Sequence, residues 1–242
     1  MADLVYRQLL QQLKKNIKAG QYQNLKLPTE RALSESYGVS RSSVKRALNI
    51  LADEGAIFKK RGSGTFINPL YLKNDSIFHY NTGRNLGVTD SFQISGKVPR
   101  IKLLSFNVVH PDPELARNLF LNADDFVYEI KRLRLFDDVA FMIETGYIPI
   151  KLAPNIGPNV VSNSIFNYME TTENKLVSKA YLTIAAEPST TEDRELLALA
   201  PTEPVGTMAG IFFLDDGTPF EYSKMRLHYK YMKYNTFVAT EE

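Results

Sequence analysis

The sequence contains no cysteine and only three histidines among its 242 residues. Without cysteine the chain cannot form a disulfide, use a thiolate nucleophile or bind zinc through sulfur, and it suits a reducing compartment. The histidines, His79, His110 and His228, lack the spacing of a metal site. We therefore expect neither a metal nor another cofactor.

Long apolar runs are also missing. The segment 209–214 is typical of those present, and none approaches the roughly 18 residues that a membrane helix needs. The first residues show no basic leader followed by an apolar stretch and a cleavage site. With 44% hydrophobic and 11% aromatic residues, the chain can still bury a core. We expect a cytoplasmic protein with no membrane partner.

Common enzyme signatures are absent as well. The sequence contains no Walker loop, no G-x-G-x-x-G and no G-x-S-x-G. It also offers no pair of a nucleophile and a base at a recognisable spacing. We therefore expect a protein that is not an enzyme.

Charge is present but unevenly divided. The 29 basic and 27 acidic residues give a net charge of only +2. Residues 1–70 hold 12 basic and 5 acidic residues (12 − 5 = +7), whereas residues 71–242 hold 17 and 22 (17 − 22 = −5). This division predicts two domains, and we expect them at 1–68 and 87–242, joined by a linker at 69–86.

The basic part has the pattern of a helix-turn-helix. Residues 4–18 have apolar positions three and four apart, which predicts a helix. Thr29 is a good N-cap for a short helix that Gly38 would end, and Ser40 is a good N-cap for the next. The second helix has an apolar stripe of Val44, Ala47, Leu48 and Leu51. Two short helices joined by a Gly-Val-Ser turn are typical of this motif.

The polar face of the second helix carries groups that bind DNA. Arg41 and Lys45 lie four residues apart, beside the small hydroxyl residues Ser42 and Ser43. Backbone amides, hydroxyls and cations at a helix start suit contacts with phosphates and base edges in a major groove. Arg41 is the best candidate for reading a guanine, because its guanidinium can donate two parallel hydrogen bonds.

A β-hairpin is predicted next. Residues 56–60 and 65–67 have strand character, and Arg61-Gly62-Ser63-Gly64 forms the tip between them. The glycines let the tip approach a phosphate or groove wall closely, and Arg61 could enter a minor groove. The hairpin is therefore expected to be a wing beside the two helices.

Several motifs resemble the winged helix-turn-helix head of GntR-type bacterial regulators: LPTER at 27–31, YGVSR at 37–41, VKRAL at 44–48, EG at 54–55 and RGSGTF at 61–66. The resemblance covers almost all of residues 4–67 and implies a set of DNA contacts. The expected DNA-binding residues are Arg31, Ser40, Arg41, Ser42, Ser43, Lys45, Arg61 and Gly62. Lys45 stands where arginine is common in this family, so the charge is kept but the forked donor is lost.

The acidic part predicts an α+β domain with an antiparallel sheet and helices packed on it. Strands are expected at 101–109, 126–136, 140–148, 176–186, 205–214 and 219–228. Helices are expected from Thr89–Ser91 to Gly96, after Pro113, near 163–171 and near 190–199.

Two of the predicted hairpins resemble each other at an offset of 79, which matches Asp137 with Asp216 and Phe141 with Phe220. At this offset Arg132 and Arg134 match Ile211 and Phe213, which would be core residues. Either this face is solvent-exposed and the repeat accidental, or the arginines need a partner such as Glu144 or a bound anion. Glu221 raises the same question, because its face carries Ser223, Met225 and Leu227.

The acidic part also resembles the UTRA effector domain, which is similar to a chorismate lyase fold and is used for sensing. The motifs are TDSF at 89–92, RLR at 132–134, ETGYIP at 144–149, SIF at 164–166 and DGTPFEY at 216–222. The resemblance implies that Ser91, Arg132, Arg134, Glu144, Ser164 and Glu221 bind the effector, and we also expect Thr89 and Phe166, from the same motifs, among the effector-binding residues. In members that sense sugar phosphates, arginines and hydroxyls hold phosphate and carboxylates hold sugar hydroxyls. Ordinary helix capping is the alternative for Thr89, Ser91 and Ser164.

Two departures from the UTRA pattern bear on the ligand. Phe166 lacks the hydroxyl of a tyrosine, and Leu227 and His228 stand where an aromatic hydroxyl is expected. Together the two resemblances predict a homodimeric transcription regulator, a repressor, that binds operator DNA and is released by a small anionic metabolite such as a phosphorylated sugar. A lyase-like enzyme with a DNA-binding appendage and a ligand-independent DNA-binding protein are the alternatives.

Overall fold

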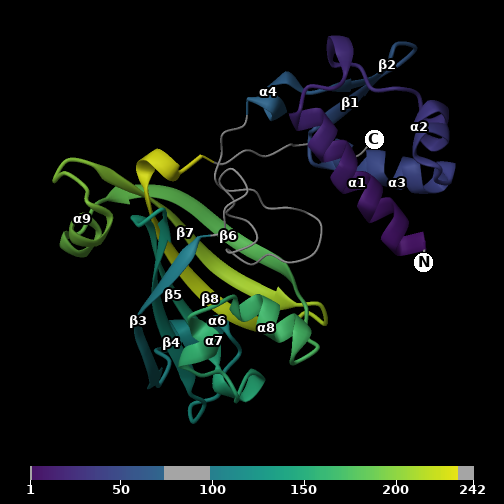
Figure 1. Ribbon diagram of the computed structural model, residues 1–242. Coiled ribbons are helices and arrows are strands. Elements are labelled where there is room, and N and C mark those ends of the chain that lie inside the picture. The colour runs from purple at the N-terminus through teal and green to yellow at the C-terminus, as the bar shows by residue number, and fades with distance from the viewer. Residues whose placement is uncertain (1, 74–98, 234–242) are drawn as a thin grey trace. The chain divides into compact units, whose positions relative to one another are not determined.

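The computed structural model describes residues 2–73 and 99–233 (Figure 1). The chain divides into two compact units, of which the first holds the described residues 2–73 and the second the described residues 99–233. The helix expected from Thr89 lies outside the described residues, and so do Thr89 and Ser91 themselves.

The first unit is built on three helices, α1 (Ala2–Lys18), α2 (Glu30–Tyr37) and α3 (Arg41–Asp53). As predicted, the Thr29 side chain caps α2 and Gly38 ends it in the left-handed conformation. The apolar faces of the helices meet in one core, which includes Leu13, Ile17, Leu33, Val44 and Leu51. A 3-10 turn at Gln23–Leu25 leads from α1 towards α2.

The wing consists of β1 (Ile57–Lys60) and β2 (Gly64–Ile67), paired antiparallel as expected. A short helix, α4 (Pro69–Leu72), follows it directly. Asn68 fixes this junction, since its side-chain amide donates to the Gly55 carbonyl at 2.9 Å and its oxygen caps α4. Tyr71 packs against the core of the unit. The segment expected to be a linker from residue 69 therefore begins with a helix that belongs to the first unit.

The second unit contains a six-stranded sheet in the order β3-β4-β5-β8-β7-β6, with every neighbouring pair antiparallel. Its strands are β3 (Arg100–Val109), β4 (Val127–Phe136), β5 (Val139–Pro149), β6 (Val177–Pro188), β7 (Pro204–Leu214) and β8 (Pro219–His228). Its helices are α6 (Pro113–Asn118), α7 (Pro158–Val161), α8 (Ile165–Thr171) and α9 (Thr191–Leu197), with 3-10 turns at Ile150–Leu152 and Tyr229–Tyr231. The α+β architecture and all six strands were predicted, whereas α7 was not.

The sheet has two differently covered faces. The inner face carries the main core, to which α7 and α8 contribute Val161, Ile165 and Met169. On the outer face α6 and α9 each cover a smaller cluster, one around Leu115 and one around Leu197. Because side chains alternate along a strand, each strand contributes to both faces.

The order of elements confirms an internal repeat: β3-α6-β4-β5 is followed by β6-α9-β7-β8. Phe141 and Phe220 are equivalent, since each is the extra residue at a register shift in its hairpin. The offset of 79 holds only for the second strand of each hairpin, because the second turn is one residue longer. In the first strand the offset is 78, so Arg134 corresponds to buried Phe212. The predicted match of Arg132 and Arg134 with Ile211 and Phe213 was therefore wrong. Side chains alternate along β7, so Ile211 and Phe213 lie on the opposite face from Phe212, which is the outer face of the sheet.

Candidate DNA-binding surface and buried arginine cluster

The start of α3 has the features that the sequence predicts. The Ser40 hydroxyl accepts a hydrogen bond from the Ser43 backbone N–H at 3.2 Å and lies 2.8 Å from the Ser42 hydroxyl. Arg41, Ser42 and Lys45 are exposed. The helix therefore presents a capped N-terminus, small hydroxyls and two cations on one accessible face, which suits phosphate and base contacts.

The other basic side chains around this helix differ in the contacts that they make within the protein. Arg31 is exposed and pairs with Glu35 at 2.8 Å, a weak surface contact that leaves its guanidinium accessible. By contrast, the Arg46 guanidinium lies 3.9 Å from the centre of the Tyr6 ring, on α1. Arg46 therefore helps to hold α1 against α3, while Arg41 and Lys45 face outward.

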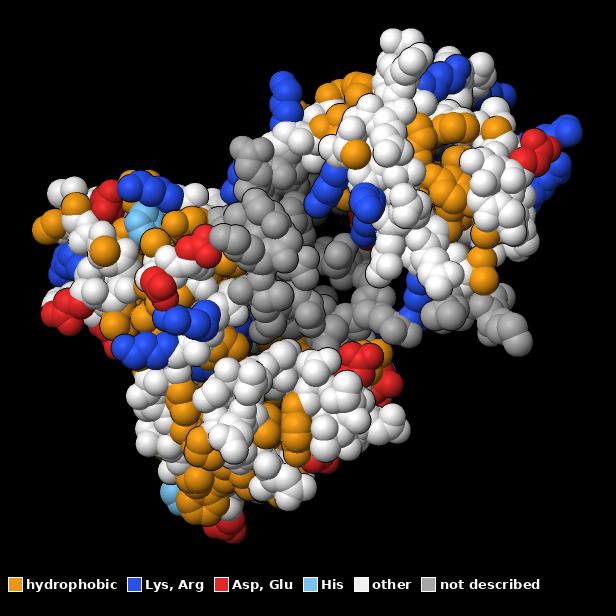
Figure 2. Space-filling view, in the orientation of Figure 1, with side chains coloured by type: hydrophobic (Ala, Val, Ile, Leu, Met, Phe, Trp, Pro, Cys, Tyr) orange, Lys and Arg blue, Asp and Glu red, His pale blue; other side chains and the backbone are white. Residues whose placement is uncertain are grey.

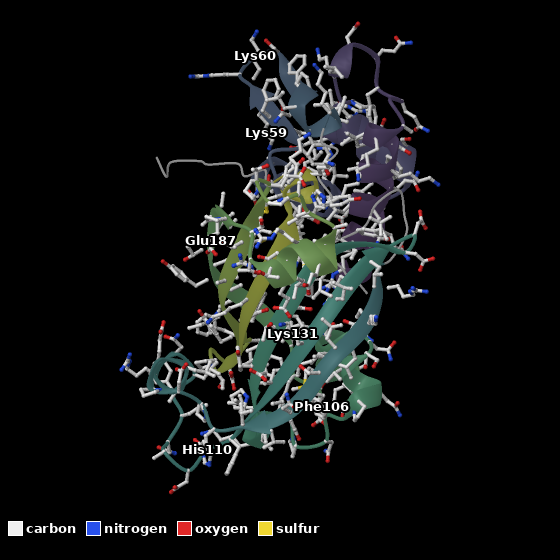
Figure 3. All side chains as sticks on the ribbon, turned by 90° about the vertical axis from the view of Figure 1, so that its left-hand side faces the viewer. Lys59, Lys60, Phe106, His110, Lys131 and Glu187 are labelled. Atoms are coloured by element: carbon white, nitrogen blue, oxygen red, sulfur yellow. The ribbon has the colours of Figure 1, made fainter. Side chains whose placement is uncertain are left out.

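The wing tip combines a glycine turn with positive charge. Gly62 has φ of 72°, a conformation that favours glycine, and open space surrounds its Cα hydrogen. Arg61 beside it is exposed, and Lys59 and Lys60 lie on the preceding strand (Figure 3). On the face seen in Figure 2, basic side chains are more abundant than acidic ones over the first unit. This unit therefore presents a cationic surface to a polyanion.

A second cluster of charges lies buried in the inner face of the sheet. Arg132 and Arg134 on β4 are only 3% and 2% exposed, which excludes the alternative of a solvent-exposed face. Glu144 on β5 pairs with both: its Oε2 lies 3.0 Å from Arg132 Nη2 and 2.8 Å from Arg134 Nη2. Glu221 on β8 is 1% exposed and belongs to the same cluster. The predicted partnership of the arginines with Glu144 is thus present.

The two carboxyl groups differ in protonation. Burial opposes the ionisation of Glu144, but the charges of Arg132 and Arg134 outweigh it and lower the pKa of this carboxyl. For Glu221, burial and the nearby charge of Glu144 raise the pKa to about 8. Near neutral pH the cluster therefore holds two guanidinium charges, one carboxylate and one neutral carboxyl. Its net charge is positive, so it favours an anion.

Several polar atoms of this cluster have no hydrogen-bond partner among the described residues. By hydrogen-bond geometry they are Arg132 Nε, Glu221 Oε2 and Ser223 Oγ, although the Ser223 side chain lies close enough to the Glu221 carboxyl to lower its pKa. Arg132 Nη1 makes only long contacts of 3.4 Å with the carbonyls of Val161 and Asn163. Buried donors and acceptors left in this state are costly, and a bound polar molecule would satisfy them.

Glycine at position 146 makes room for the Glu221 carboxyl. A Cβ at Gly146 would lie only 2.4 Å from Glu221 Oε1. Gly146 and Ser223 also face each other across β5 and β8. Neither was among the predicted site residues, although Ser223 shares the face of Glu221 and Gly146 lies within the ETGYIP motif.

The remaining predicted effector residues lie around this cluster with structural roles of their own. The Ser164 hydroxyl accepts from the Asn167 backbone N–H at 3.3 Å and caps α8, as the capping alternative predicts. Phe166 is buried and contacts Phe212 and Phe220 edge to face. Phe220 directly precedes Glu221 in the chain, so Phe166 contributes to the site indirectly, by packing against Phe220.

A surface hollow of about 410 Å³ lies elsewhere on the second unit, lined by Val108, Asp124, Asp125, Phe126, Ile150 and Lys151. It shares no residue with the buried cluster. In the described ranges no three acidic or histidine side chains are placed to hold a metal ion. Within the same ranges no helix combines the length and apolarity needed to cross a membrane.

A basic winged helix-turn-helix, joined to a sheet domain that buries a positive cluster, defines a transcription regulator with a second, separate domain. Comparisons with known proteins agree. Residues 5–67 match bacterial regulatory proteins of the gntR family, and residues 95–233 match the UTRA domain. The chain belongs to the GntR family, in the branch that carries a UTRA domain. It is a regulator and not an enzyme, because that is the nature of this family.

Individual relatives cover nearly the whole chain. The transcriptional repressor NagR of Bacillus subtilis is 29% identical over 221 residues, which are 91% of this chain and 88% of NagR. The regulator GmuR of the same organism is 31% identical, over 88% of this chain and 87% of GmuR. The crystal structure of the possible transcriptional regulator YydK from B. subtilis is 26% identical, covers 98% of this chain and 99% of that one, and has a TM-score of 0.79.

Proposed function

We propose that this regulator is a cytoplasmic repressor that binds its operator as a homodimer and is released by a small anionic metabolite, a phosphorylated sugar. The α3 helix enters the major groove and the wing of β1 and β2 lies in the adjacent groove. The metabolite binds at the cluster of Arg132, Arg134, Glu144 and Glu221. The single observation that carries the effector site is the buried, net positive cluster with its unpartnered polar atoms.

The chemistry of the cluster supports a ligand with two kinds of group. Guanidinium donors bind phosphate oxygens well, and the unpartnered Nε of Arg132 is free for such a bond. A neutral Glu221 carboxyl and the Ser223 hydroxyl can each donate and accept, which suits sugar hydroxyls. The names of relatives support the sugar part of this ligand: MngR is the repressor of a mannosyl-D-glycerate transport and metabolism system, and a solved effector-binding domain is that of the trehalose repressor TreR. NagR is also a repressor.

The coupling between the two units must come from a difference in affinity. A ligand shifts the regulator away from its operator only if it binds the non-binding arrangement of the heads more tightly. A dimer must match two half-sites at once, so a modest reorientation of one head is enough to release it.

The experiment starts from an operator selected out of a random duplex library by the purified chain. Binding of the labelled operator is then followed by fluorescence anisotropy during titration with individual sugar phosphates, the matching free sugars and inorganic phosphate. We expect one sugar phosphate to lower operator affinity, with little effect of its free sugar. Arg132→Ala should keep operator binding and lose this response.

Lys131→Ala is the matched control, because Lys131 is the neighbouring cation on β4 and lies on the opposite face. A normal response of Arg132→Ala to the sugar phosphate would contradict the proposed site. If no metabolite changes operator binding or thermal stability, the alternative of a ligand-independent DNA-binding protein is favoured instead.

A further inference from the structure

Lys26 lies beside the wing, although it precedes α2 in the sequence. It forms an isolated antiparallel bridge with Phe66 of β2. The backbone N–H of the next residue, Leu27, donates to the Thr65 carbonyl at 2.9 Å, and the Leu27 side chain is buried in the core of the first unit. Residues 26 and 27 therefore form a short third strand along β2, which fixes the backbone of Lys26 next to the hairpin.

The two faces of the wing hairpin differ. Ile57 and Ile67 are buried in the core of the first unit. Because side chains alternate along a strand, Phe58 and Lys60 of β1 and Phe66 of β2 lie on the opposite face, which we call the solvent face of the wing. The rings of Phe58 and Phe66 stack there with their centroids 5.9 Å apart. The solvent face is therefore an aromatic surface with a lysine near the hairpin tip.

The side chain of Lys26 crosses this solvent face towards the tip. Its Nζ lies 5.7 Å from the centre of the Phe66 ring, a cation–π contact. Its Cε and Nζ lie 3.0 and 3.8 Å from the position that a Cβ at Gly64 would occupy. Gly64 has φ of 118°, a conformation that favours glycine, and the missing side chain leaves this space to Lys26. Phe66 and Gly64 together give the ammonium group a defined place at the wing tip.

Three cations gather at this tip without a counter-charge. Lys60 lies on the solvent face and Arg61 follows it in the turn (Figure 3). Neither of them, nor Lys26, forms an ion pair with a carboxylate in the part of the chain that the structure describes. By contrast, Lys59 on the opposite face pairs with Glu30 at 3.7 Å. Like charges held close together repel each other, so this arrangement favours the binding of a polyanion.

A phosphate of a DNA backbone suits the ammonium group of Lys26. The side chain is exposed and makes no hydrogen bond with another described residue, so its three donors can reach phosphate oxygens. A lysine is a point charge without the planar fork that guanine reading uses. Contacts of this kind fix the position of a protein on a duplex and carry no sequence information.

We infer that Lys26 binds a phosphate of the operator backbone at the wing, with Phe66 and Gly64 as its positioning residues. The inference deepens the DNA-binding part of the proposed function and rests on it. Lys26 supplies affinity and fixes the place of the wing on the duplex, whereas Arg41 reads a base.

The test removes the charge of Lys26 and keeps its stem over the Phe66 ring, in Lys26→Met. Binding of the operator selected from the random duplex library is measured by fluorescence anisotropy at about 50 and about 200 mM salt. One phosphate contact contributes about −0.9 to the slope of log affinity against log salt, so the advantage of the wild type over the variant should shrink about threefold over this range. The preference among single-base variants of the operator should stay unchanged.

Lys59→Met is the matched control, because it removes the same charge from the opposite face of the same hairpin. We expect it to keep the salt slope of the wild type, and we expect Lys26→Arg, which keeps a cation, to restore most of that slope. Ethylation of single phosphates in the operator locates the contact. One ethylated phosphate in each half-site should weaken binding of the wild type and have no effect on Lys26→Met.

The possible failures are distinguishable. A wild-type salt slope in Lys26→Met, or the same ethylation pattern in both proteins, would overturn the role of Lys26 and leave operator binding intact. An equal loss of slope in Lys26→Met and Lys59→Met would mean that net charge alone acts, which also overturns it. A wild-type chain that selects no operator would overturn the DNA-binding part of the proposed function itself.

Discussion

Arg134 donates from both Nε and Nη2 to one oxygen of Glu144, Oε2, at 2.9 and 2.8 Å. Arg132 adds a third contact to this oxygen, and it is Arg132 that faces Glu144 in the strand register. One carboxylate therefore balances two buried guanidinium groups on the neighbouring strand. Glu144 is therefore the shared counter-charge of both arginines, and the cluster keeps an excess of positive charge.

Removing the charge of Glu144 should destabilise the second unit. In Glu144→Gln two buried arginines lose their common anion, and we expect a loss of about 3 kcal/mol in the free energy of unfolding. Urea denaturation measures it. Asp138→Asn is the control, because Asp138 is 77% exposed in its pair with Arg100 and should matter little. Equal stability of the two variants would show that the buried pair has no such role.

The neutral carboxyl of Glu221 predicts a pH dependence of stability. In the unfolded chain it loses its proton near 4.5, whereas in the folded protein it keeps it to about pH 8. The folded state therefore binds more protons between these values, and stability falls as pH rises through this window. In Glu221→Gln this fall should be absent. The test is the difference in urea midpoint between wild type and variant from pH 5 to 9; a constant difference contradicts the assignment.

Much of this site could be predicted from sequence, and the reasons differ by residue. Arg132, Arg134 and Glu144 were predictable because strand alternation puts them on one face and a buried arginine needs a counter-charge. The match with Ile211 and Phe213 was wrong because the second turn is one residue longer than the first. The extra residue shifts the alignment of the preceding strands by one position, and a shift of one position exchanges the two faces of a strand. No local pattern distinguishes Gly146, since its role is to leave space for Glu221, which is 75 positions away (221 − 146).

Arg41 and Lys45, two of the exposed cations of α3, should differ in their effect on DNA binding. Arg41→Ala should cost about 1–3 kcal/mol and relax the preference for one base, because guanine reading needs the forked donor. Lys45→Ala should weaken binding to all sequences and reduce the slope of affinity against salt by about one. Anisotropy titrations against operator and single-base variants at several salt concentrations separate these effects. An unchanged base preference in Arg41→Ala would contradict the role of Arg41 in reading a guanine.

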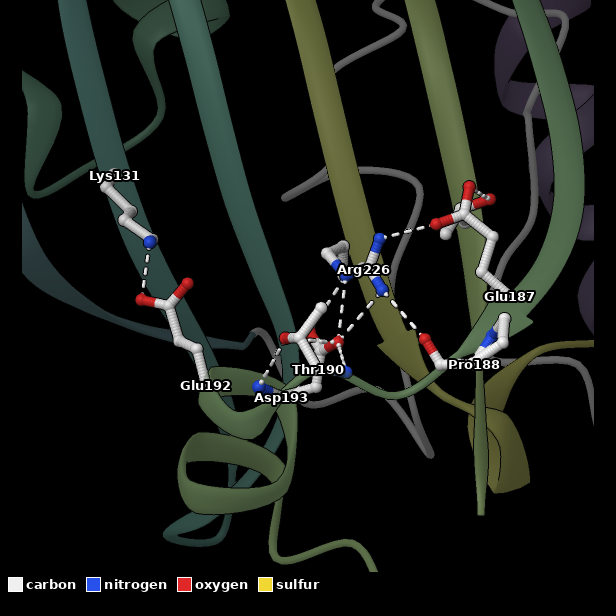
Figure 4. Close-up of polar contacts among 8 residues, drawn as sticks. Lys131, Glu187, Pro188, Thr190, Glu192, Asp193 and Arg226 are labelled. Carbon is white, nitrogen blue, oxygen red and sulfur yellow. Dashed lines mark hydrogen bonds and ion pairs between the residues drawn. The ribbon is translucent and has the colours of Figure 1, made fainter. Parts of the chain in front are cut away.

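Two acidic residues that are adjacent in α9 offer a matched comparison (Figure 4). Asp193 is 1% exposed, accepts from Arg226 Nε at 2.9 Å and also from the Thr190 backbone N–H at 2.7 Å, so it ties α9 to β8. Glu192 pairs with Lys131 at the surface, where solvent screens the contact.

Asp193→Asn should therefore lower the free energy of unfolding by about 2–3 kcal/mol, because it removes a buried charge from a three-way contact. Glu192→Gln should change it by less than about 0.5 kcal/mol. Urea denaturation of both variants at neutral pH tests the pair. Since they differ by one position in the same helix, a similar loss in both would mean that helix propensity or capping, rather than the link to Arg226, sets the stability of α9 on the sheet.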